Sequence, residues 1–139
     1  MKEKMIHAYM ECARAFAKLS YAERKKVGGI AVTPQDVVVY SWNGRVAGGC
    51  NVCEIEGQDV TRPDVLHCES NIVAKAAREG ISLKGSTVIQ TLSPCLPCSM
   101  QMYQAGVARV VYDEEYRDLT GVEFLKGLHV RVDKYEDLK

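Results

Sequence analysis

Residue types that bind zinc in proteins recur at short spacing in this chain. His67 stands two residues before Glu69, and Pro94-Cys95-Leu96-Pro97-Cys98 follows further along the chain. One histidine and two cysteines are the usual number of protein ligands at a catalytic zinc, where the fourth position is left to water. Glu69 can act on that water without being a ligand. The spacing therefore predicts a hydrolytic zinc centre with the ligands His67, Cys95 and Cys98.

A purely structural zinc, or thiols packed in the core, is the alternative for these residues. A structural site normally has a fourth protein ligand. Cys68 is available, but it follows His67 directly and should point elsewhere on a helix. We expect Cys68 to be a small buried residue, which favours the catalytic interpretation.

Hydrophobic periodicity predicts the elements that position these residues. Helices are expected over 4–19, from near 68 to just before Gly80, over 95–105 and over 119–126, the last three ending at Gly80, Gly106 and Gly127. Strands are expected over 27–32, 37–42, 86–91, 107–112 and 130–132, with loop from 43 to about 63. We expect one α/β domain over 1–139, a five-stranded mixed sheet with helices on both faces.

The same pattern explains how two distant motifs could meet. Cys95 and Cys98 lie three residues apart at the start of one predicted helix, and His67 and Glu69 lie at the start of another. The segment between the motifs is long enough for one helix and one strand, so a right-handed crossover would bring the two helix starts together. Helix N-termini carry partial positive charge, which favours thiolates.

Composition limits the class of partner. The 139 residues hold 18 basic and 18 acidic side chains, a formal net charge of zero. This balance lacks the basic footprint of a protein that grips long nucleic acid. No long uncharged apolar run occurs, so we expect neither a signal peptide nor a membrane span. The CxxC spacing then favours metal binding in a reducing cytoplasm over disulfides.

His67-x-Glu69 with Pro94-Cys95-x-x-Cys98 is the signature of zinc deaminases. The chain resembles the deoxycytidylate (dCMP) deaminase family, within the zinc-dependent cytidine/deoxycytidylate deaminase superfamily, from about Val27 to Arg117. The matching segments are Val27-Gly28-Gly29, Trp42-Asn43-Gly44 with Ala47-Gly48, Thr91-Leu92-Ser93 before Pro94, Gln104-Ala105-Gly106-Val107 and Val110-Val111-Tyr112.

This resemblance implies a three-layer cytidine-deaminase-like fold and hydrolysis of dCMP to dUMP and ammonia, in pyrimidine deoxynucleotide metabolism. Glu69 would carry a water proton to N3 of the base and a second proton to the departing amino group. Rival activities are deamination of dCTP, of cytidine or deoxycytidine nucleosides, or of adenosine in tRNA. A zinc-stabilised binding module without turnover is a further alternative, which the retention of Glu69 disfavours.

By resemblance, Asn43 would hydrogen-bond the sugar and Tyr116 would close over the base, with Trp42 and Gly44 in the substrate loop. Candidate phosphate or effector residues are Arg45, Gly48, Asn71 and Arg117. The family also implies a homohexamer, activation by dCTP and inhibition by dTTP, with Mg²⁺ accompanying a triphosphate effector. Trp42 departs from the usual tyrosine, and Val46 stands where proline is common.

Several residues keep competing interpretations. Cys50 and Cys53 form a second CxxC, which either binds another zinc with a neighbour such as Cys12 or, as we favour, holds free or packed thiols. Asn43 precedes Gly44 and could simply shape a turn. Arg45 could face a phosphate or be a solvated loop residue, and we favour the second interpretation. Of the two tyrosines after the strand at 107–112, we assign Tyr116 to the site.

Overall fold

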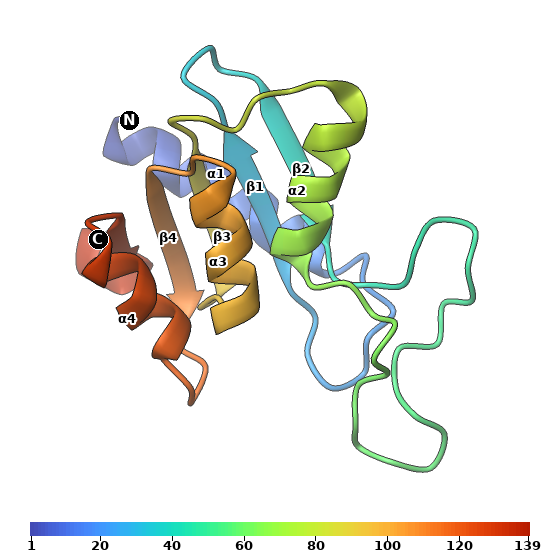
Figure 1. Ribbon diagram of the computed structural model, residues 1–139. Coiled ribbons are helices and arrows are strands. Elements are labelled where there is room, and N and C mark those ends of the chain that lie inside the picture. The colour runs from blue at the N-terminus through green and yellow to red at the C-terminus, as the bar shows by residue number, and fades with distance from the viewer.

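A computed structural model describes residues 1–139 as a five-stranded sheet with four α-helices (Figure 1). The strands are β1 (Gly28–Val32), β2 (Val38–Trp42), β3 (Thr87–Leu92), β4 (Arg109–Glu114) and β5 (Arg131–Lys134). The helices are α1 (Glu3–Ala17), α2 (Cys68–Glu79), α3 (Leu96–Gln104) and α4 (Thr120–Gly127), and a 3₁₀ turn, η1 (Tyr135–Leu138), ends the chain.

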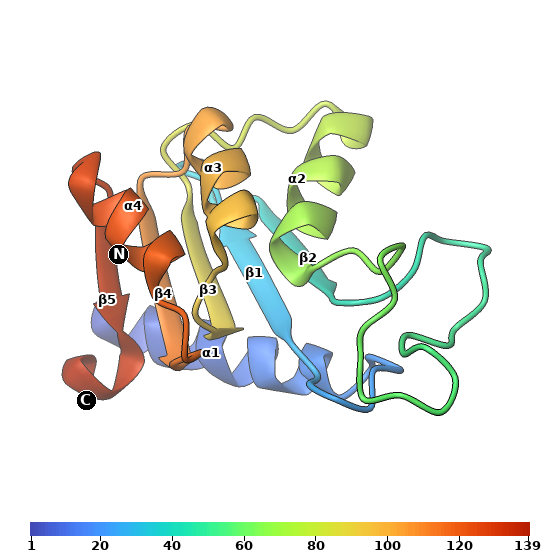
Figure 2. The ribbon, with the colours of Figure 1, turned by 60° about the horizontal axis from the view of Figure 1, so that its bottom comes forward.

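The sheet has the order β2-β1-β3-β4-β5. β1 is antiparallel to both β2 and β3, while β3, β4 and β5 run parallel. Figure 2 shows α1 across one face of this sheet and α2, α3 and α4 on the other. The expected five-stranded mixed sheet with helices on both faces is confirmed.

Each face of the sheet has its own hydrophobic core. Ile6, Met10 and Ala13 form the buried stripe of α1 and pack on Ile89 and Val111 of the central strands. The larger cluster lies between the sheet and α2–α4. Alternation along β3 and β4 sends successive side chains to opposite faces, so both faces of these central strands are buried.

Close packing of α1 on β1 depends on Gly28. A Cβ atom at this position would lie 2.2 Å from the carbonyl oxygen of Ala13 and 2.5 Å from the nitrogen of Ala17. The helix backbone therefore rests directly on the strand backbone, which fixes the height of α1 over the sheet.

The helices of the other face bring their N-termini to one edge of the sheet. α2 ends at Gly80, which has φ 69° as the sequence predicts for a left-handed cap, and the chain then enters β3. Since α2 runs antiparallel to β3 and α3 starts soon after β3 ends, His67 and Cys95 are the N-cap residues of neighbouring helices. Both therefore lie beyond the carboxyl end of β3.

The element boundaries differ from the sequence expectations near the C-terminus. β4 begins at Arg109, because the N–H of Val107 still bonds to the carbonyl of Met102 in α3 and that of Ala108 bonds to Ser86, before β3 begins. Gly127 is the last residue of α4 and not its cap, and the left-handed residue is His129, with φ 64°.

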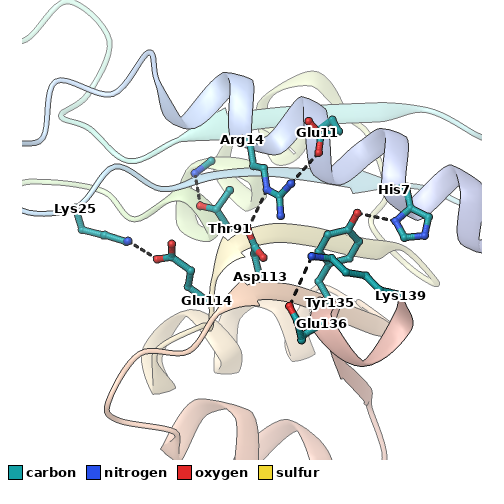
Figure 3. Close-up of polar contacts among 11 residues, drawn as sticks. His7, Glu11, Arg14, Lys25, Thr91, Asp113, Glu114, Tyr135, Glu136 and Lys139 are labelled. Atoms are coloured by element: carbon teal, nitrogen blue, oxygen red, sulfur yellow. Dashed lines mark hydrogen bonds and ion pairs between the residues drawn. The ribbon is translucent and has the colours of Figure 1, made fainter.

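The turn η1 was not expected from the sequence. It docks on α1, where the buried Tyr135 and the Nδ1 of His7 share a hydrogen bond of 2.6 Å (Figure 3). Elsewhere in the fold, no helix combines the length and apolar character needed to cross a membrane, and the six cysteines form no disulfide.

Candidate active site

The two cysteines and the histidine of the predicted zinc centre converge at the paired helix N-termini. Nδ1 of His67 lies 3.3 Å from Sγ of Cys95 and 3.4 Å from Sγ of Cys98. All three ligand atoms lie within 4.8 Å of one another. A tetrahedral zinc, with Zn–N about 2.0 Å and Zn–S about 2.3 Å, separates such nitrogen and sulfur atoms by about 3.5 Å. The donor set and its spacing therefore fit Zn²⁺.

The close approach of the two thiols moves their pKa values in opposite directions. The pKa of Cys95 is lowered to about 4, chiefly because Cys98 donates a hydrogen bond to its sulfur and His67 donates another. The pKa of Cys98 is raised because its proton serves that bond and because the thiol is buried. The pKa of His67 is raised by its hydrogen bond to Cys95. A bound Zn²⁺ would take the place of the thiol protons, since cysteine binds metal as the thiolate.

Glu69 lies in the first turn of α2 and is only 5% exposed. Burial is the main cause that raises the pKa of its carboxyl to about 7, and nearby Cys95 acts in the same direction. His67 and a side-chain hydrogen bond with Gln90 work in the opposite direction. A carboxyl that titrates near neutrality can both accept and donate a proton, as general acid–base catalysis requires.

Gln90 is a buried amide in the middle of β3 that the sequence reasoning did not single out. It is fully buried, and its Nε2 donates a hydrogen bond of 2.6 Å to the carbonyl oxygen of Leu92. A large polar residue directly after the apolar pair Val88-Ile89 of this strand was the signal that could have identified it.

His67, Cys95 and Glu69 line one cavity of about 690 Å³, while the third predicted ligand, Cys98, is buried behind them. The cavity lies beyond the carboxyl ends of the parallel strands β3 and β4, where α/β sheets commonly bind ligands. Its walls also include Leu92, Ser93 and Glu114 at these strand ends. The lining residues are Arg24, Lys25, Val27, Asn43, Asp59, Thr61, Val65, His67, Cys68, Glu69, Leu92, Ser93, Cys95, Glu114, Glu115, Tyr116 and Arg117.

Cys68 faces away from the metal cluster, as expected for a residue that follows His67 on a helix. Its side chain is fully buried, with Sγ 3.4 Å from the carbonyl oxygen of Ser41. Gly29 makes room for it, since a Cβ there would lie 2.8 Å from this sulfur. The metal-binding group therefore has three protein ligands.

Asn43 lines the cavity and also ties its wall together. Its Oδ1 accepts a hydrogen bond of 2.9 Å from the backbone N–H of Val27, and its Nδ2 donates one of 2.8 Å to the carbonyl oxygen of Lys25. Its own carbonyl accepts the hydroxyl of Ser20 at 2.8 Å. The residue thus fixes the segment that leads into β1, a structural role beyond the turn that Asn-Gly suggests.

Trp42 and Asn71 stand outside the cavity lining. Trp42 stacks on Tyr40 and Phe16, with ring centroids 6.3 and 6.2 Å apart, toward the α1 face of the sheet. Nδ2 of Asn71 donates to the carbonyl oxygen of Trp42 at 3.0 Å. Their hydrogen bond fixes the end of β2 to α2, the helix that carries Glu69. It thereby fixes the start of the loop that contains Asn43.

Gly44, Arg45 and Gly48 also lie outside the lining. Gly44 forms a bridge with Leu66, and Gly48 has φ 83° in an exposed loop. The guanidinium of Arg45 pairs with the carboxylate of Asp64 at 2.6 Å, and its side chain is 20% exposed. The residue is therefore an ion-paired loop arginine, neither freely solvated nor directed into the cavity.

Tyr116 and Arg117 lie at the rim of the cavity, whereas Tyr112 is buried in the core. The backbone N–H of Tyr116 donates to Oγ of Ser93 at 2.7 Å. The Arg117 guanidinium lies 5.9 Å from the Tyr116 ring centroid and has no carboxylate partner. The rim thus presents an aromatic ring with a free cation beside it.

Arg24, Lys25, Asp59 and Thr61 are lining residues that the sequence reasoning missed. The basic run Arg24-Lys25-Lys26 comes directly before β1. Because β1 is antiparallel to β3, its start lies at the same edge of the sheet as the carboxyl end of β3. That topological relation was the available signal for Arg24 and Lys25, while no local pattern marks Asp59 or Thr61.

The second CxxC gathers no further ligands. Cys53 is buried and Cys50 is exposed. The only group of three or more potential metal ligands is that of His67, Cys95 and Cys98. The structure thus agrees with the favoured interpretation of Cys50 and Cys53 as free or packed thiols.

Comparisons with known proteins agree with this site. Residues 3–114 match the family model of the cytidine and deoxycytidylate deaminase zinc-binding region. The deoxycytidylate deaminase of Mycobacterium phage D29 is 33% identical over 120 residues, which cover 77% of this chain and 92% of the phage protein. ComE operon protein 2 of Bacillus subtilis is 29% identical over 112 residues, which cover 78% of this chain but 59% of that relative.

A solved structure is similar over nearly the whole chain. The dCMP deaminase from cyanophage S-TIM5, in complex with dCMP and dUMP, is 40% identical, with a TM-score of 0.91. The match covers 96% of this chain and 98% of the phage chain.

Proposed function

Because the chain belongs to the cytidine and deoxycytidylate deaminase family, we propose that it hydrolyses dCMP to dUMP and ammonia. The bond that breaks joins C4 of the base to its amino group, and water supplies the oxygen that replaces it. The similarity to a phage dCMP deaminase solved with dCMP and dUMP supports this choice of substrate.

The observation that carries the proposal is the cluster of His67, Cys95 and Cys98, two of which line the same cavity as the buried Glu69. Three protein ligands leave a coordination position open, which is the arrangement of catalytic zinc sites. A structural site would not need a buried carboxyl beside three ligands.

Glu69 is the proton carrier in this mechanism. Zinc supplies Lewis acidity that makes water a nucleophile at neutral pH. Glu69 accepts a proton from the attacking water and delivers it to N3 of the base. It then takes the second proton from the hydroxyl that water has placed on C4 and passes it to the departing amino group. Its pKa near 7 suits both directions of transfer. While they ligate zinc, Cys95 and Cys98 cannot take this role.

Three residues of the cavity lining are proposed to contact the substrate: Asn43, Tyr116 and Arg117. Asn43 uses one N–H and one lone pair of its amide on the backbone, which leaves one of each for the sugar. Tyr116 offers its ring to the base and Arg117 offers a free guanidinium. Trp42 and Gly44 contribute by holding the loop that carries Asn43.

Regulation by dCTP and dTTP, with Mg²⁺ beside a triphosphate, and assembly into a homohexamer are the second part of the proposal. They rest on the family resemblance. An effector phosphate at Arg45 would displace Asp64 from its ion pair. Gly48 and Asn71 also remain candidate effector residues by resemblance. Gly48 lies in the same loop as Arg45, and Asn71 bonds to the carbonyl oxygen of Trp42.

Ammonia release from zinc-loaded protein tests the proposal. The substrates are dCMP, dCTP and deoxycytidine, each with and without dCTP or dTTP as effectors. Preference for dCMP over deoxycytidine supports nucleotide deamination, and a change of rate with effectors supports the regulatory part. Zinc at one ion per chain without turnover of any of the three would overturn the proposed activity.

A further inference from the structure

Lys25 and Glu114, from two different segments of the cavity lining, form an ion pair (Figure 3). Lys25 precedes β1 and Glu114 ends β4, and β3 separates these two strands in the sheet. Both residues line the cavity. The pair therefore links two walls that no backbone hydrogen bond joins at this point.

The backbone of Lys25 is fixed beside the proposed sugar contact. Nδ2 of Asn43 donates to the carbonyl oxygen of Lys25 at 2.8 Å, and Oδ1 of Asn43 accepts the N–H of Val27 at 2.9 Å. The Lys25 side chain thus starts from the wall that Asn43 shapes. Since one carbon joins the 5′-phosphate of a nucleotide to its sugar, a cation whose backbone is bonded to Asn43 starts close to where the phosphate is expected.

The other cations of the cavity are placed differently. The Arg24 guanidinium is held by Thr61 at 3.0 Å and by Asp59 at 3.4 Å. Arg117 lies over Tyr116 at the rim. Lys25 alone combines a position next to Asn43 with a single carboxylate partner inside the cavity.

The Lys25–Glu114 pair can open at low cost. Its side chains are 48% and 59% exposed, and ion pairs this exposed contribute little to stability. A phosphate monoester carries nearly two negative charges and three acceptor oxygens, so it attracts an ammonium more strongly than one carboxylate does.

We propose that Lys25 recognises the 5′-phosphate by leaving Glu114, and that Glu114 holds the lysine when no phosphate is present. The inference rests on the proposed function, since it takes a deoxycytidine nucleotide as the ligand. A nucleoside has no phosphate to replace Glu114 as the partner of Lys25, so this change of partner favours nucleotides over nucleosides. Glu114 lowers nucleotide affinity by competing for the lysine.

Equilibrium binding of the product dUMP, with deoxyuridine as its phosphate-free counterpart, tests this exchange without turnover. Calorimetry compares zinc-loaded wild type with Lys25→Gln, Glu114→Gln and the double variant. Lys26→Gln is the matched control, because Lys26 is exposed, adjacent and outside the cavity lining. The turnover of dCMP is measured separately on the wild type.

We expect Lys25→Gln to weaken dUMP binding about tenfold, the loss typical of a charge-assisted contact to phosphate. Glu114→Gln should tighten dUMP binding about threefold, and this gain should vanish in the double variant. Deoxyuridine binding should change in none of them. Zinc content and circular dichroism confirm that each variant is folded.

Equal dUMP binding by Lys25→Gln and Lys26→Gln would overturn the inference, even if dCMP is turned over. Weaker binding of dUMP by Glu114→Gln, or no measurable dUMP binding by the wild type, would overturn it as well. The expected binding pattern without dCMP turnover would support phosphate recognition by Lys25 and would refute only the proposed activity.

Discussion

Oγ of Ser93 accepts a hydrogen bond of 2.7 Å from the backbone N–H of Tyr116. Ser93 directly precedes Pro94-Cys95, the short segment that leads into α3 and is called the cysteine loop below. The N–H of Ser93 donates to the carbonyl oxygen of Glu114 at 2.9 Å. The serine is 4% exposed. One buried side chain thus sets the position of the rim residue Tyr116 relative to the metal ligands.

Replacement of Ser93 by alanine should loosen Tyr116 without disturbing the metal. A lost neutral hydrogen bond costs about 1 kcal/mol, so we expect KM for dCMP to rise about fivefold. Zinc content and kcat should stay close to wild type. Steady-state kinetics with Ser82→Ala, an exposed serine outside the site, provides the comparison. An unchanged KM would show that the Tyr116 backbone need not be held.

Replacement of Glu69 by glutamine should abolish turnover and leave zinc bound. The amide keeps the shape of the carboxyl but cannot accept the water proton, and loss of general acid–base catalysis lowers rates about 10²–10⁴-fold. Ammonia release and zinc content are measured together. Glu79→Gln, at the exposed end of the same helix, should retain full activity. Substantial turnover by Glu69→Gln would remove Glu69 from the mechanism.

Zinc-free protein should lose stability as pH rises, because Glu69 is buried. Its pKa is about 7 in the folded chain against 4.5 as the reference for the unfolded chain. Between these values the folded state binds more protons, so the free energy of unfolding falls through this window. Above pH 7, the free energy of unfolding of zinc-free Glu69→Gln should exceed that of zinc-free wild type by on the order of 3 kcal/mol. A difference in urea unfolding that is the same near pH 4.5 and near pH 8 would contradict this origin.

Removal of one thiol ligand should remove the metal. Cys98→Ala deletes a ligand of the cluster, so zinc content should fall from one ion per chain to a small fraction. The melting temperature should then match that of chelator-treated wild type, since a ligand bound to the native state stabilises it. Cys53→Ala, which deletes a buried thiol outside the cluster, should keep one zinc. Loss of zinc from Cys53→Ala would instead indicate a second metal site.

Much of the fold was predictable because its elements have clear periodicity. The stripe with Ile6, Met10 and Ala13 marks α1, and the apolar β-branched run around Val110 and Val111 marks β4. The turn η1 was missed because four residues carry too little pattern to predict a helical turn. Its order comes from tertiary contacts of Tyr135 with α1.

The metal ligands were predictable from spacing, but the cavity walls were not. His67 and Cys95 are N-cap residues, so local sequence places them once the helices are found. Asp59 and Thr61 enter the wall through the long loop after β2, whose path depends on contacts such as that of Glu54 with the backbone of Glu23. Such loop positions carry no periodic signal in the sequence.

Gly121 of α4 packs directly against the cysteine loop, so an added methyl group at this position should push the two apart. A Cβ there would lie 2.3 Å from the carbonyl oxygen of Pro94 and 2.7 Å from that of Cys95. Gly121→Ala should therefore destabilise the fold by about 1–3 kcal/mol and weaken zinc retention, because Cys95 must shift. Gly127→Ala in the same helix meets no atom within 4 Å, so it should be neutral or slightly stabilising. Equal melting temperatures and zinc content for both variants would show that α4 does not support the cysteine loop.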